Sequence, residues 1–420
     1  MTTPTGWDTI TIDQCCHVLD CKRVPVNAEA RQRRIGDVPY YGANGLQGYI
    51  DDFIFDEPLI LMAEDGGRFD EFATYPIAYR ISGKSWVNNH AHVLRAKTGF
   101  CQNAIFYSLE HKDIQAFIVG GTRAKLNQRA LRSITVQLPV DFEEQSKIAE
   151  VLSTMDRAIE QTEALIVKQQ RIKTGLMQDL LTKGIDEHGR IRSEETHEFK
   201  DSPLGRIPTE WDVSRLDGAV NIVDCMHFTP QYVDEGIPII RPRNVKIDGL
   251  DLTDCDFVSP SDFAVLTDKH VPTKGDIVFS RNASFGIPVY LDSDSSLCIG
   301  QDVVVMTRKS ALTRYVYYSL LSDYMTRQIN VLSAGSTFGR IDLGAIRQLQ
   351  VALPDPTEQS VIIHQIDLAS DAERLEISVL AKYQALKTGL MRDLLSGEVP
   401  VTPLLGNTIL ELTGALDGVH

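Results

Sequence analysis

This chain of 420 residues lacks several features that mark familiar classes of protein. No run approaches the roughly 18 apolar residues of a membrane-spanning helix. Residues 1–14 have neither the basic start nor the apolar stretch of a secretory signal. The seven cysteines are odd in number and never spaced as CxxC, so neither a disulfide framework nor a zinc site is expected. These absences favour a protein of the reducing cytoplasm, away from the membrane.

Positive charge is also scarce. Lys and Arg number 42 against 57 Asp and Glu, which gives a net charge of −15. A chain that binds nucleic acid by itself is usually basic, so any contact with DNA is expected to use local patches or a partner's positive surface. The composition, 43% hydrophobic and 24% charged, is that of folded globular proteins, and the length predicts two or three domains.

Motifs of common catalytic sites are missing as well. There is no GxxxxGK phosphate loop, no GxGxxG after a strand, no Pro-Pro-aromatic methyltransferase motif and no Asp…Glu-x-Lys nuclease core. Gly42, Gly45 and Gly48 have the spacing of a turn. His90 and His92 would face the same side of a strand, but no acidic or cysteine partner is near in sequence. A structural or DNA-facing pair is therefore favoured over a metal site, and no catalytic or metal-binding residue is expected.

What the chain does contain is an internal repeat. KTGLMQDLL at 173–181 returns as KTGLMRDLL at 387–395, with eight of nine positions identical at an offset of 214. The same offset aligns the Glu-Gln-Ser at 144–146 with the Glu-Gln-Ser at 358–360. Two anchors in register over about forty residues indicate a tandem of two variable units, each followed by a helix. The charged, turn-rich segment between the copies is interpreted as a linker.

Long helices are predicted where the repeat is strongest. Residues 143–182 contain no proline and follow a heptad pattern with an apolar stripe three positions wide. Two helices in an ordinary seam need only two such positions, so the third predicts docking of further protein. The predicted docking residues are Ile148, Leu152, Met155, Ile159, Ile166, Leu176, Ile362, Ile366, Leu380 and Leu390.

Each variable unit has the pattern of short strands between turns together with a helix. In the first, strands are expected at 10–12, 49–50, 58–62, 77–81 and 92–94 and a helix at 104–110. In the second, strands are expected at 237–240, 276–279, 288–291 and 302–306 and a helix at 314–329. The predicted fold class is α+β. The predicted boundaries are a first unit at 1–142, a helix at 143–183, a linker at 184–204, a second unit at 205–355, a helix at 356–398 and a tail at 399–420.

The chain resembles a known family at these positions. The carrying motifs are VPYYGANGLQGYIDD (38–52), LILMAEDGG (59–67), SGKSWVNNHAHVL (82–94), LPVDFEEQSKIAEVLSTMDRAIEQTEALI (138–166), FKDSPLGRIPTEWDVSRL (199–216) and the repeated KTGLMxDLL. They are similar to those of the specificity (S) subunit of type I restriction–modification enzymes. The second unit, at 217–347, departs more from the pattern, and the last twenty residues match nothing in it.

The resemblance implies a function without catalysis. Each variable unit is expected to be a target recognition domain that reads one half of a bipartite, asymmetric DNA site. The two helices are expected to pack as an antiparallel coiled coil, to set the spacing of the half-sites and to dock two modification subunits. S-adenosylmethionine, ATP and Mg²⁺ are expected on partner subunits, which include restriction subunits with translocase and nuclease activity. This assignment predicts phage defence through DNA methylation and restriction.

Candidate DNA-binding residues are the Arg, Asn, Gln, His and Tyr side chains expected at loop tips, because such groups can read base edges. They are Tyr41, Asn44, Gln47, Asn88, Asn89 and His90 in the first unit, and Arg241, Arg243, Asn244, Arg281, Asn282 and Gln301 in the second. Lys125 and Arg340 align between the copies and are expected to contact phosphates.

Three alternatives remain open. The chain could serve a methylation-only or type IIB-like system, because the nuclease would lie on another chain. A built-in methyltransferase or nuclease is disfavoured by the missing motifs. A helical scaffold without a DNA role is disfavoured by the loops rich in amides and arginine.

Overall fold

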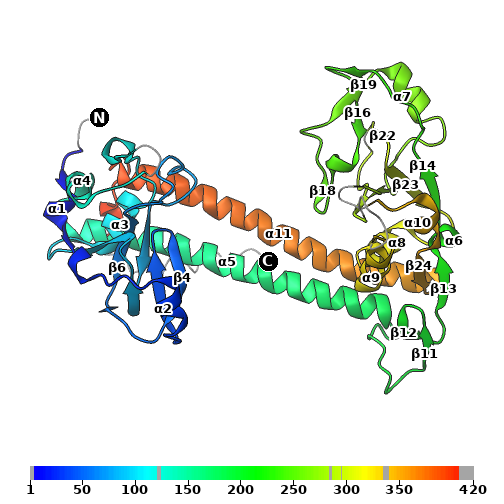
Figure 1. Cartoon of the computed structure of the whole chain (residues 1–420), viewed down its shortest axis with the longest axis horizontal. Helices are drawn as coiled ribbons and strands as arrows, with labels where there is room; N and C mark the ends of the chain where they lie inside the picture. Colours follow the sequence, from blue (N-terminus) through cyan, green and yellow to red (C-terminus); the bar gives the residue numbers. More distant parts are fainter. Residues whose placement is uncertain (1–3, 121–123, 283–285, 295, 334–339, 406–420) are drawn as a thin grey trace. The chain divides into compact units, whose positions relative to one another are not determined.

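The computed structural model describes residues 4–120, 124–282, 286–294, 296–333 and 340–405 (Figure 1). The chain divides into two compact units: a first unit of residues 1–163 and 378–420, and a second unit of residues 164–377. No helix in the described ranges is long and apolar enough to cross a membrane. Of the predicted C-terminal tail, residues 406–420 lie outside the described residues.

The first unit is a mixed α/β domain completed by parts of both long helices. Its elements are β1 (Trp7–Thr11), α1 (Ile12–Cys15), β2 (Cys16–Val18), η1 (Asp20–Lys22), α2 (Ala28–Gln32), β3 (Val38–Gly42), β4 (Gly45–Ile50), β5 (Phe55–Asp56), β6 (Leu59–Ala63), β7 (Ala78–Ile81), β8 (Lys84–Val87), β9 (Ala91–Ala96), α3 (Gln102–Glu110), η2 (Gln115–Phe117), α4 (Gln128–Ser133), β10 (Thr135–Pro139) and η4 (Thr402–Leu404). The helix α5 (Phe142–Thr182) starts in this unit, and α11 (Pro356–Leu395) ends in it.

The second unit has the corresponding set. Its elements are β11 (Phe199–Ser202), β12 (Gly205–Pro208), β13 (Asp212–Arg215), α6 (Leu216–Ala219), β14 (Val220–Asp224), β15 (Tyr232–Val233), β16 (Ile237–Ile240), η3 (Pro242–Asn244), β17 (Val245–Lys246), β18 (Gly249–Leu250), β19 (Asp256–Val258), α7 (Pro260–Leu266), β20 (Ile277–Ser280), β21 (Pro288–Tyr290), β22 (Cys298–Ile299), β23 (Val303–Arg308), α8 (Thr313–Leu320), α9 (Asp323–Ser333), α10 (Leu343–Gln348) and β24 (Gln350–Leu353).

The strand order shows that the repeat predicted from sequence is a repeat of fold. One four-stranded sheet runs β2-β9-β6-β7 in the first unit and β14-β23-β20-β21 in the second. In each unit, the strand before the first short helix pairs with the strand that leads into the long helix: β1 with β10, and β13 with β24. Each unit also contains a parallel strand pair, β3 with β8 and β16 with β22. The predicted α+β class is confirmed.

Most of the predicted elements have counterparts in the structure. The strand expected at 58–62 is β6, the one expected at 237–240 is β16, and the helix expected at 104–110 is α3. The helix expected at 314–329 is instead two helices, α8 and α9. The Ser322 hydroxyl causes this break, because it accepts a hydrogen bond from the Met325 N–H (3.3 Å) and so caps α9.

Aspartate side chains start both long helices. The Asp141 carboxylate accepts from the N–H of Glu143 (3.0 Å), and Asp355 accepts from the N–H of Thr357 (2.8 Å). A side-chain oxygen at this position satisfies N–H groups that have no partner within the helix. Beyond the other ends lie Gly184 and Gly397, with φ of +67° and +72°, a left-handed conformation that glycine adopts without strain.

The repeated KTGLMxDLL segment packs the last turns of each helix into the core of the other copy's domain. Leu180 and Leu181 of α5 belong to the core of the second unit. Leu394 of α11, with Leu390 packed beside it, belongs to the core of the first unit. The start of one helix therefore meets the end of the other in both units, which confirms the predicted antiparallel pairing.

The lysine of this segment crosses to the opposite helix in both copies. Lys173 of α5 pairs with Glu373 of α11 (2.7 Å), and Lys387 of α11 pairs with Asp156 of α5 (2.8 Å). Lys387 also contacts Glu110 at the end of α3 (3.0 Å). Burial lowers the pKa of Lys387, but its two carboxylate partners outweigh burial and hold it above the ordinary value. The lysine thus stays charged where the helices cross.

The glutamine of the Glu-Gln-Ser repeat fastens each long helix to its own domain. Gln145 is 1% exposed; its amide accepts from the Cys101 N–H (2.8 Å) and donates to the Pro139 carbonyl (2.8 Å). Gln359 is 2% exposed and makes the same two contacts in the second unit. One side chain therefore joins the incoming strand, the start of the long helix and the start of α3 or α8.

The segment interpreted as a linker is folded onto the second unit. Ile185 and Leu204 are buried in its core, and β11 and β12 form a hairpin. Glu358 of α11 holds this segment by accepting from the Ile185 N–H (2.9 Å), pairing with Arg192 and accepting from the Trp211 indole (3.1 Å). Composition indicated the turns, but it did not reveal these buried contacts.

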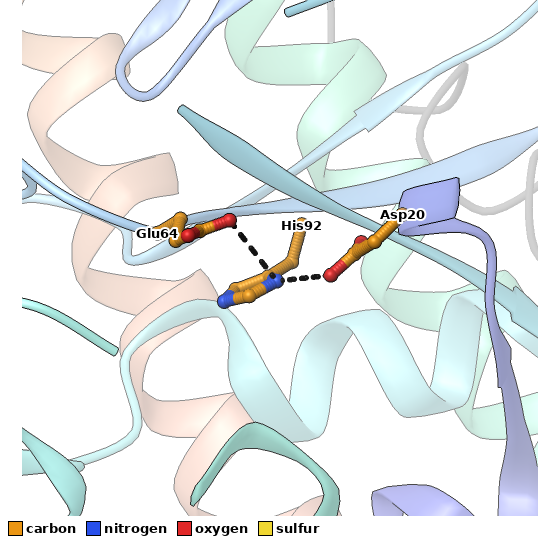
Figure 2. Close-up of side chains that lie close together, drawn as sticks. All are labelled: Asp20, Glu64 and His92. Carbon is orange, nitrogen blue, oxygen red and sulfur yellow. Dashed lines mark hydrogen bonds and ion pairs between the residues drawn. The ribbon is translucent and has the colours of Figure 1, made fainter. Parts of the chain in front are cut away.

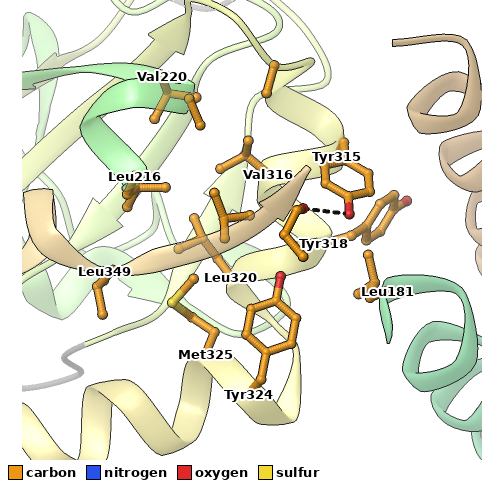
Figure 3. Close-up of a cluster of buried hydrophobic side chains, with 14 of the residues drawn as sticks. Leu181, Leu216, Val220, Tyr315, Val316, Tyr318, Leu320, Tyr324, Met325 and Leu349 are labelled. Atoms are coloured by element: carbon orange, nitrogen blue, oxygen red, sulfur yellow. Dashed lines mark hydrogen bonds between the residues drawn. The ribbon is translucent and has the colours of Figure 1, made fainter. Parts of the chain in front are cut away.

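The core of the second unit is built from apolar side chains of α6, α8, α9 and the paired strands, with Leu181 at its edge (Figure 3). Tyr315 is fully buried and donates its hydroxyl hydrogen bond to the Ala352 carbonyl of β24 (2.9 Å). Burial raises the pKa of Tyr315 well above its ordinary value, so the hydroxyl remains a donor. The α8 helix is thereby tied to the strand that leads into α11.

We expect Gln145→Ala to destabilise the first unit, because it leaves the Cys101 N–H and the Pro139 carbonyl without their buried partner. Each unsatisfied group costs about 1–3 kcal/mol. Urea unfolding followed by circular dichroism measures the loss. Gln161→Ala, at an exposed position on the same helix, is the matched control. Equal unfolding midpoints for the two variants would contradict this role.

Candidate nucleic-acid interface

The predicted DNA-binding residues of the first unit gather at one edge of its other four-stranded sheet, which has the strand order β4-β3-β8-β5. Tyr41, Asn44 and Gln47 lie on the β3–β4 hairpin, and 88–90 follow β8. Strands β3 and β8 are parallel neighbours, with Tyr40 and Tyr41 beside Trp86 and Val87, so their carboxyl ends lie at the same edge. The structure therefore brings together two sets of residues that are about forty positions apart in sequence.

Asn88 organises this edge from inside. It is only 4% exposed; its amide donates to the Gln47 side-chain oxygen (3.1 Å) and its oxygen accepts from the His90 N–H (2.8 Å). Its own N–H donates to the Tyr41 carbonyl (3.0 Å). The prediction that Asn88 is a loop-tip reader is therefore wrong, because its hydrogen-bonding groups are used within the domain.

The other members of the set are more accessible. Gln47 and Asn89 are exposed, and only the oxygen of the Gln47 carboxamide is used in its bond with Asn88. Asn44 is exposed and donates to the Gly66 carbonyl (2.9 Å). Gly42 leaves room for Gln47, since a Cβ there would lie 2.1 Å from the Gln47 Nε2. One of the three spaced glycines therefore makes space for a predicted contact residue.

A cavity of about 340 Å³ opens beside these residues. Its lining includes Tyr40, Gln47, Asn88, Asn89 and His90, together with Arg31, which the candidate set omitted. Tyr41 lies outside it and is half-buried; burial, followed by the neighbouring Tyr49, raises the pKa of Tyr41 and keeps its hydroxyl protonated. The site is thus a small hollow with several hydrogen-bonding side chains on its wall.

The arginines predicted for the second unit are held by aspartates. Arg241 pairs with Asp256 (2.9 Å), and Arg243 pairs with the other oxygen of the same carboxylate (3.0 Å). The hydrogen bond with Asp256 is the largest influence on the pKa of Arg243 and raises it. Both arginines keep exposed faces, with side chains 42% and 43% exposed, so they remain near the surface although their charge is balanced.

Two residues of the second set are structural. Arg281 is 6% exposed, pairs with Asp224 (3.1 Å) and donates to the Ile341 carbonyl (3.2 Å). Asn244 is 1% exposed and donates to two backbone carbonyls, those of Asp251 and Asp254. Their predicted role as base contacts is wrong, because burial within the domain leaves no surface for a base.

The remaining predicted contacts of the second unit meet at one carboxylate. Asn282 donates to Asp302 (3.1 Å) and Arg340 pairs with it (2.6 Å). Gln301, the preceding residue, is exposed. Asp302 has a positive φ of +63°, which is uncommon for a residue with a side chain. In the first unit, the aligned Lys125 pairs with Glu64 (3.0 Å) in a similar way.

The two histidines of the NNHAHVL motif enter different networks. His90 lies before β9 and bonds Asp65 (2.7 Å). His92 is fully buried; its Nδ1 bonds Asp20 (2.6 Å) and lies 3.9 Å from Glu64, and its Nε2 faces the Leu126 carbonyl (2.7 Å) (Figure 2). Sequence gave no acidic partner for His92, because Asp20 and Glu64 are 72 and 28 positions away.

Asp20, Glu64 and His92 could in principle hold a cation, since their ligand atoms lie within 4.8 Å of one another. The two carboxylates are already balanced, because Arg23 bonds Glu64 (2.8 Å) and lies 3.5 Å from Asp20. Lys125 takes the second oxygen of Glu64. A divalent ion would have to displace these cations, so we interpret the cluster as a structural ion-pair network.

Comparison with known proteins now identifies the family. A model of the type I restriction modification DNA specificity domain matches residues 4–169 and 208–377, once in each unit. The chain belongs to this family. A type I restriction enzyme specificity subunit of Methanocaldococcus jannaschii, MjaVIII, is 25% identical over 312 residues, which is 71% of either chain.

Solved structures agree on the fold. The S subunit of a type I restriction–modification system from M. genitalium superposes with a TM-score of 0.64 at 14% identity, covering 94% of this chain and 98% of that one. A chain from a structure of type I restriction–modification complex assembly gives a TM-score of 0.52 at 16% identity, covering 95% and 100%. The family model confirms the resemblance found in the motifs, and the solved structures agree with the fold it implies.

Several docking residues predicted for this specificity subunit are buried in its own domains. Ile148 and Leu152 belong to the core of the first unit, and Ile362 and Ile366 to that of the second. They are wrong as docking residues, because at most 2% of each residue is exposed. Ile166, another predicted docking residue, is also largely covered within the chain, with 9% of it exposed. Met155, Ile159, Leu176, Leu380 and Leu390 are partly buried.

Three exposed apolar residues of α11 form a row that is not part of the predicted docking set. Val361, Leu368 and Leu375 are 38%, 52% and 63% exposed and are spaced by seven, which places them along one side of the helix. In the same unit, Val167 and Ile172 of α5 are also about half exposed. The heptad spacing of the three α11 residues was present in the sequence, but periodicity alone does not distinguish the seam from an outer stripe.

We expect Asp20→Asn to destabilise the specificity subunit by roughly 3–5 kcal/mol, the cost of breaking a buried pair. Asp13→Asn, which removes an exposed pairing with Arg132, is the control and should change stability little. Burial acts to raise the pKa of Asp20, but hydrogen bonds from His92 and Val93 and the charge of Arg23 hold it below its ordinary value.

The same variant has a predicted pH dependence. Because the folded-state pKa of Asp20 lies below its unfolded value of about 3.9, its contribution is complete above that pH. The contribution is lost as the pH falls through the folded-state value. Thermal melting from pH 7 down to the acid limit should show the two proteins converging only below about pH 4. A constant difference across this range would rule out the network.

Proposed function

We propose that this specificity subunit recognises DNA for a type I restriction–modification complex and that each unit reads one half of a bipartite, asymmetric site. The observation that carries the proposal is the repetition of one domain fold with different side chains at equivalent edges. The first unit presents amides and a histidine beside β3 and β8, and the second presents arginines near β16. Two units that share a fold but carry different side chains in their loops can read two different half-sites.

In this proposal, the catalytic activities of the complex lie on other chains. Proteins named as specificity subunits do not carry the chemistry, so adenine methylation with S-adenosylmethionine would reside on two modification subunits. DNA translocation and cleavage with ATP and Mg²⁺ would reside on restriction subunits. The acidic balance of this chain fits, because partner subunits would supply much of the positive surface around the duplex.

The stripe Val361, Leu368 and Leu375 is proposed as a docking surface for a modification subunit. Soluble proteins rarely leave rows of large aliphatic side chains in water unless another protein covers them. The length of α5 and α11 is proposed to set the spacing between half-sites, because both helices run without interruption from one unit into the other. A methylation-only or type IIB-like system would use the same subunit in the same way.

Replacing residues 4–139 with the first recognition domain of another family member should change one half of the methylated sequence and leave the other half intact. The reason is that all contacts predicted for the first half-site lie on this segment. Sequencing of methylated adenines in a host that carries the complete system reads the outcome. The reciprocal exchange of 212–353 is the control. Simultaneous change of both halves would refute separate reading.

The double variant Leu368→Gln, Leu375→Gln should weaken assembly with the modification subunits roughly tenfold or more, because two large apolar side chains lose their buried contacts. Its thermal stability alone should be nearly unchanged, since both residues are exposed in the chain. Light scattering coupled to size exclusion measures assembly. Asp371→Asn with Arg374→Gln, an exposed ion pair on the same helix, is the control. Full assembly of the apolar double variant would exclude this surface.

A further inference from the structure

Two arginines of the first unit stack on two neighbouring aromatic rings. The helix α2 begins at the Asn27 cap, whose side chain accepts from the Ala30 N–H (2.7 Å). One turn apart, the Arg31 and Arg34 guanidinium groups lie 4.6 Å and 4.5 Å from the ring centres of Tyr40 and Trp86. These two aromatic residues are themselves partners in the parallel β3–β8 pair.

The rings form a rigid platform. The Tyr40 hydroxyl donates to the Val26 carbonyl (3.0 Å), and the Trp86 indole donates to the Val24 carbonyl (2.8 Å). Tyr40 is 1% exposed and Trp86 is 6% exposed. The extended segment that leads into α2 is therefore tied to the same side chains on which the arginines stack, and the position of each guanidinium is set in advance.

The two arginines differ in what else they contact. Arg34 pairs with Asp51 (2.6 Å), and its neighbour Arg33 pairs with Glu29 (2.5 Å). Within the described part of the chain, Arg31 has no ion-pair or side-chain hydrogen-bond partner. Stacking positions its guanidinium through the flat face, so the N–H donors around the edge stay available.

Arg31 lines the cavity of about 340 Å³ that also holds Gln47, Asn89 and His90. This volume is at the small end of the ~300–1,000 Å³ typical of ligand sites. The Gln47 amide is oriented there by Asn88, whose own position is fixed by the Tyr41 carbonyl. The hollow thus combines a stacked, unpaired arginine with positioned amides.

We infer that Arg31 reads a guanine in the first half-site, an inference that rests on the proposed DNA-recognition function. Two parallel N–H donors of a guanidinium match the O6 and N7 acceptors that guanine presents in the major groove. A phosphate also accepts from arginine, but contacts that only position the duplex need no amide-lined hollow. Arg31, rather than the aspartate-paired arginines, then determines specificity in this unit.

The test uses Arg31→Lys and Arg31→Gln in the complete complex, with methylated adenines sequenced genome-wide. Both variants should lose discrimination at one guanine of the first half-site by roughly tenfold to hundredfold, while the second half-site stays unchanged. Lysine keeps the charge and can remain over Tyr40, which preserves folding, but it lacks the two parallel donors. Arg34→Gln is the control and should lower the melting temperature without altering the recognised sequence.

A binding measurement separates base from backbone contact. Replacing that guanine with 7-deazaguanine removes the N7 acceptor, so it should weaken binding of the wild-type complex and have little effect on the Arg31→Gln complex. If Arg31→Lys retains full sequence discrimination, or if the first half-site contains no guanine, the inference is wrong. If the wild-type complex recognises no bipartite site, the proposed function itself fails, which is a different result.

Discussion

Each of the two cores is closed by the first turns of one long helix and the last turns of the other. Gln145 and Gln359 fix the helix starts to the incoming strand and to α3 or α8. The leucines of the KTGLMxDLL repeat pack the helix ends into the cores. Neither domain can be completed by its own segment of chain alone. The heptad pattern, the glutamine and the KTGLM motif recur together because the same junction is built twice.

The excess of acidic side chains determines which arginines are left without a partner. The 57 Asp and Glu residues outnumber the 42 Lys and Arg residues. Most of the buried or partly buried arginines therefore pair with a carboxylate, as Arg281 does with Asp224 and Arg23 with Glu64. Such pairs hold loops in place but leave little net positive field. Among the arginines that the structure describes, Arg31 therefore stands apart, because it stacks on a ring and has no carboxylate partner. In the first unit, sequence-specific contact would depend on Arg31, with partner subunits providing the general attraction to the duplex.

The burial of polar residues explains which site predictions failed. Asn88, Asn244 and Arg281 were chosen because their residue types can read bases, and all three instead hold backbone segments inside a domain. Ile148 and Leu152 were chosen for their place in the heptad, and both face the core of the first unit. Residue type and periodicity identify the elements correctly, but they do not reveal which partner covers a side chain. Arg31 was missed for the converse reason, because nothing in ARQRR distinguishes it from its paired neighbours.

The sequence by itself determined the tandem repeat, the two long helices, the α+β class and the family, because these depend on local periodicity and on motifs that occur twice. Only the tertiary structure decided which groups are free to bind. Arg34 meets Asp51, Lys387 meets Glu110 and His92 meets Asp20 across separations of 17, 277 and 72 residues. Whether a charged group is paired within the fold depends on its distance from other charges in space. The packing of strands and helices brings those partners together without any signal in the local sequence.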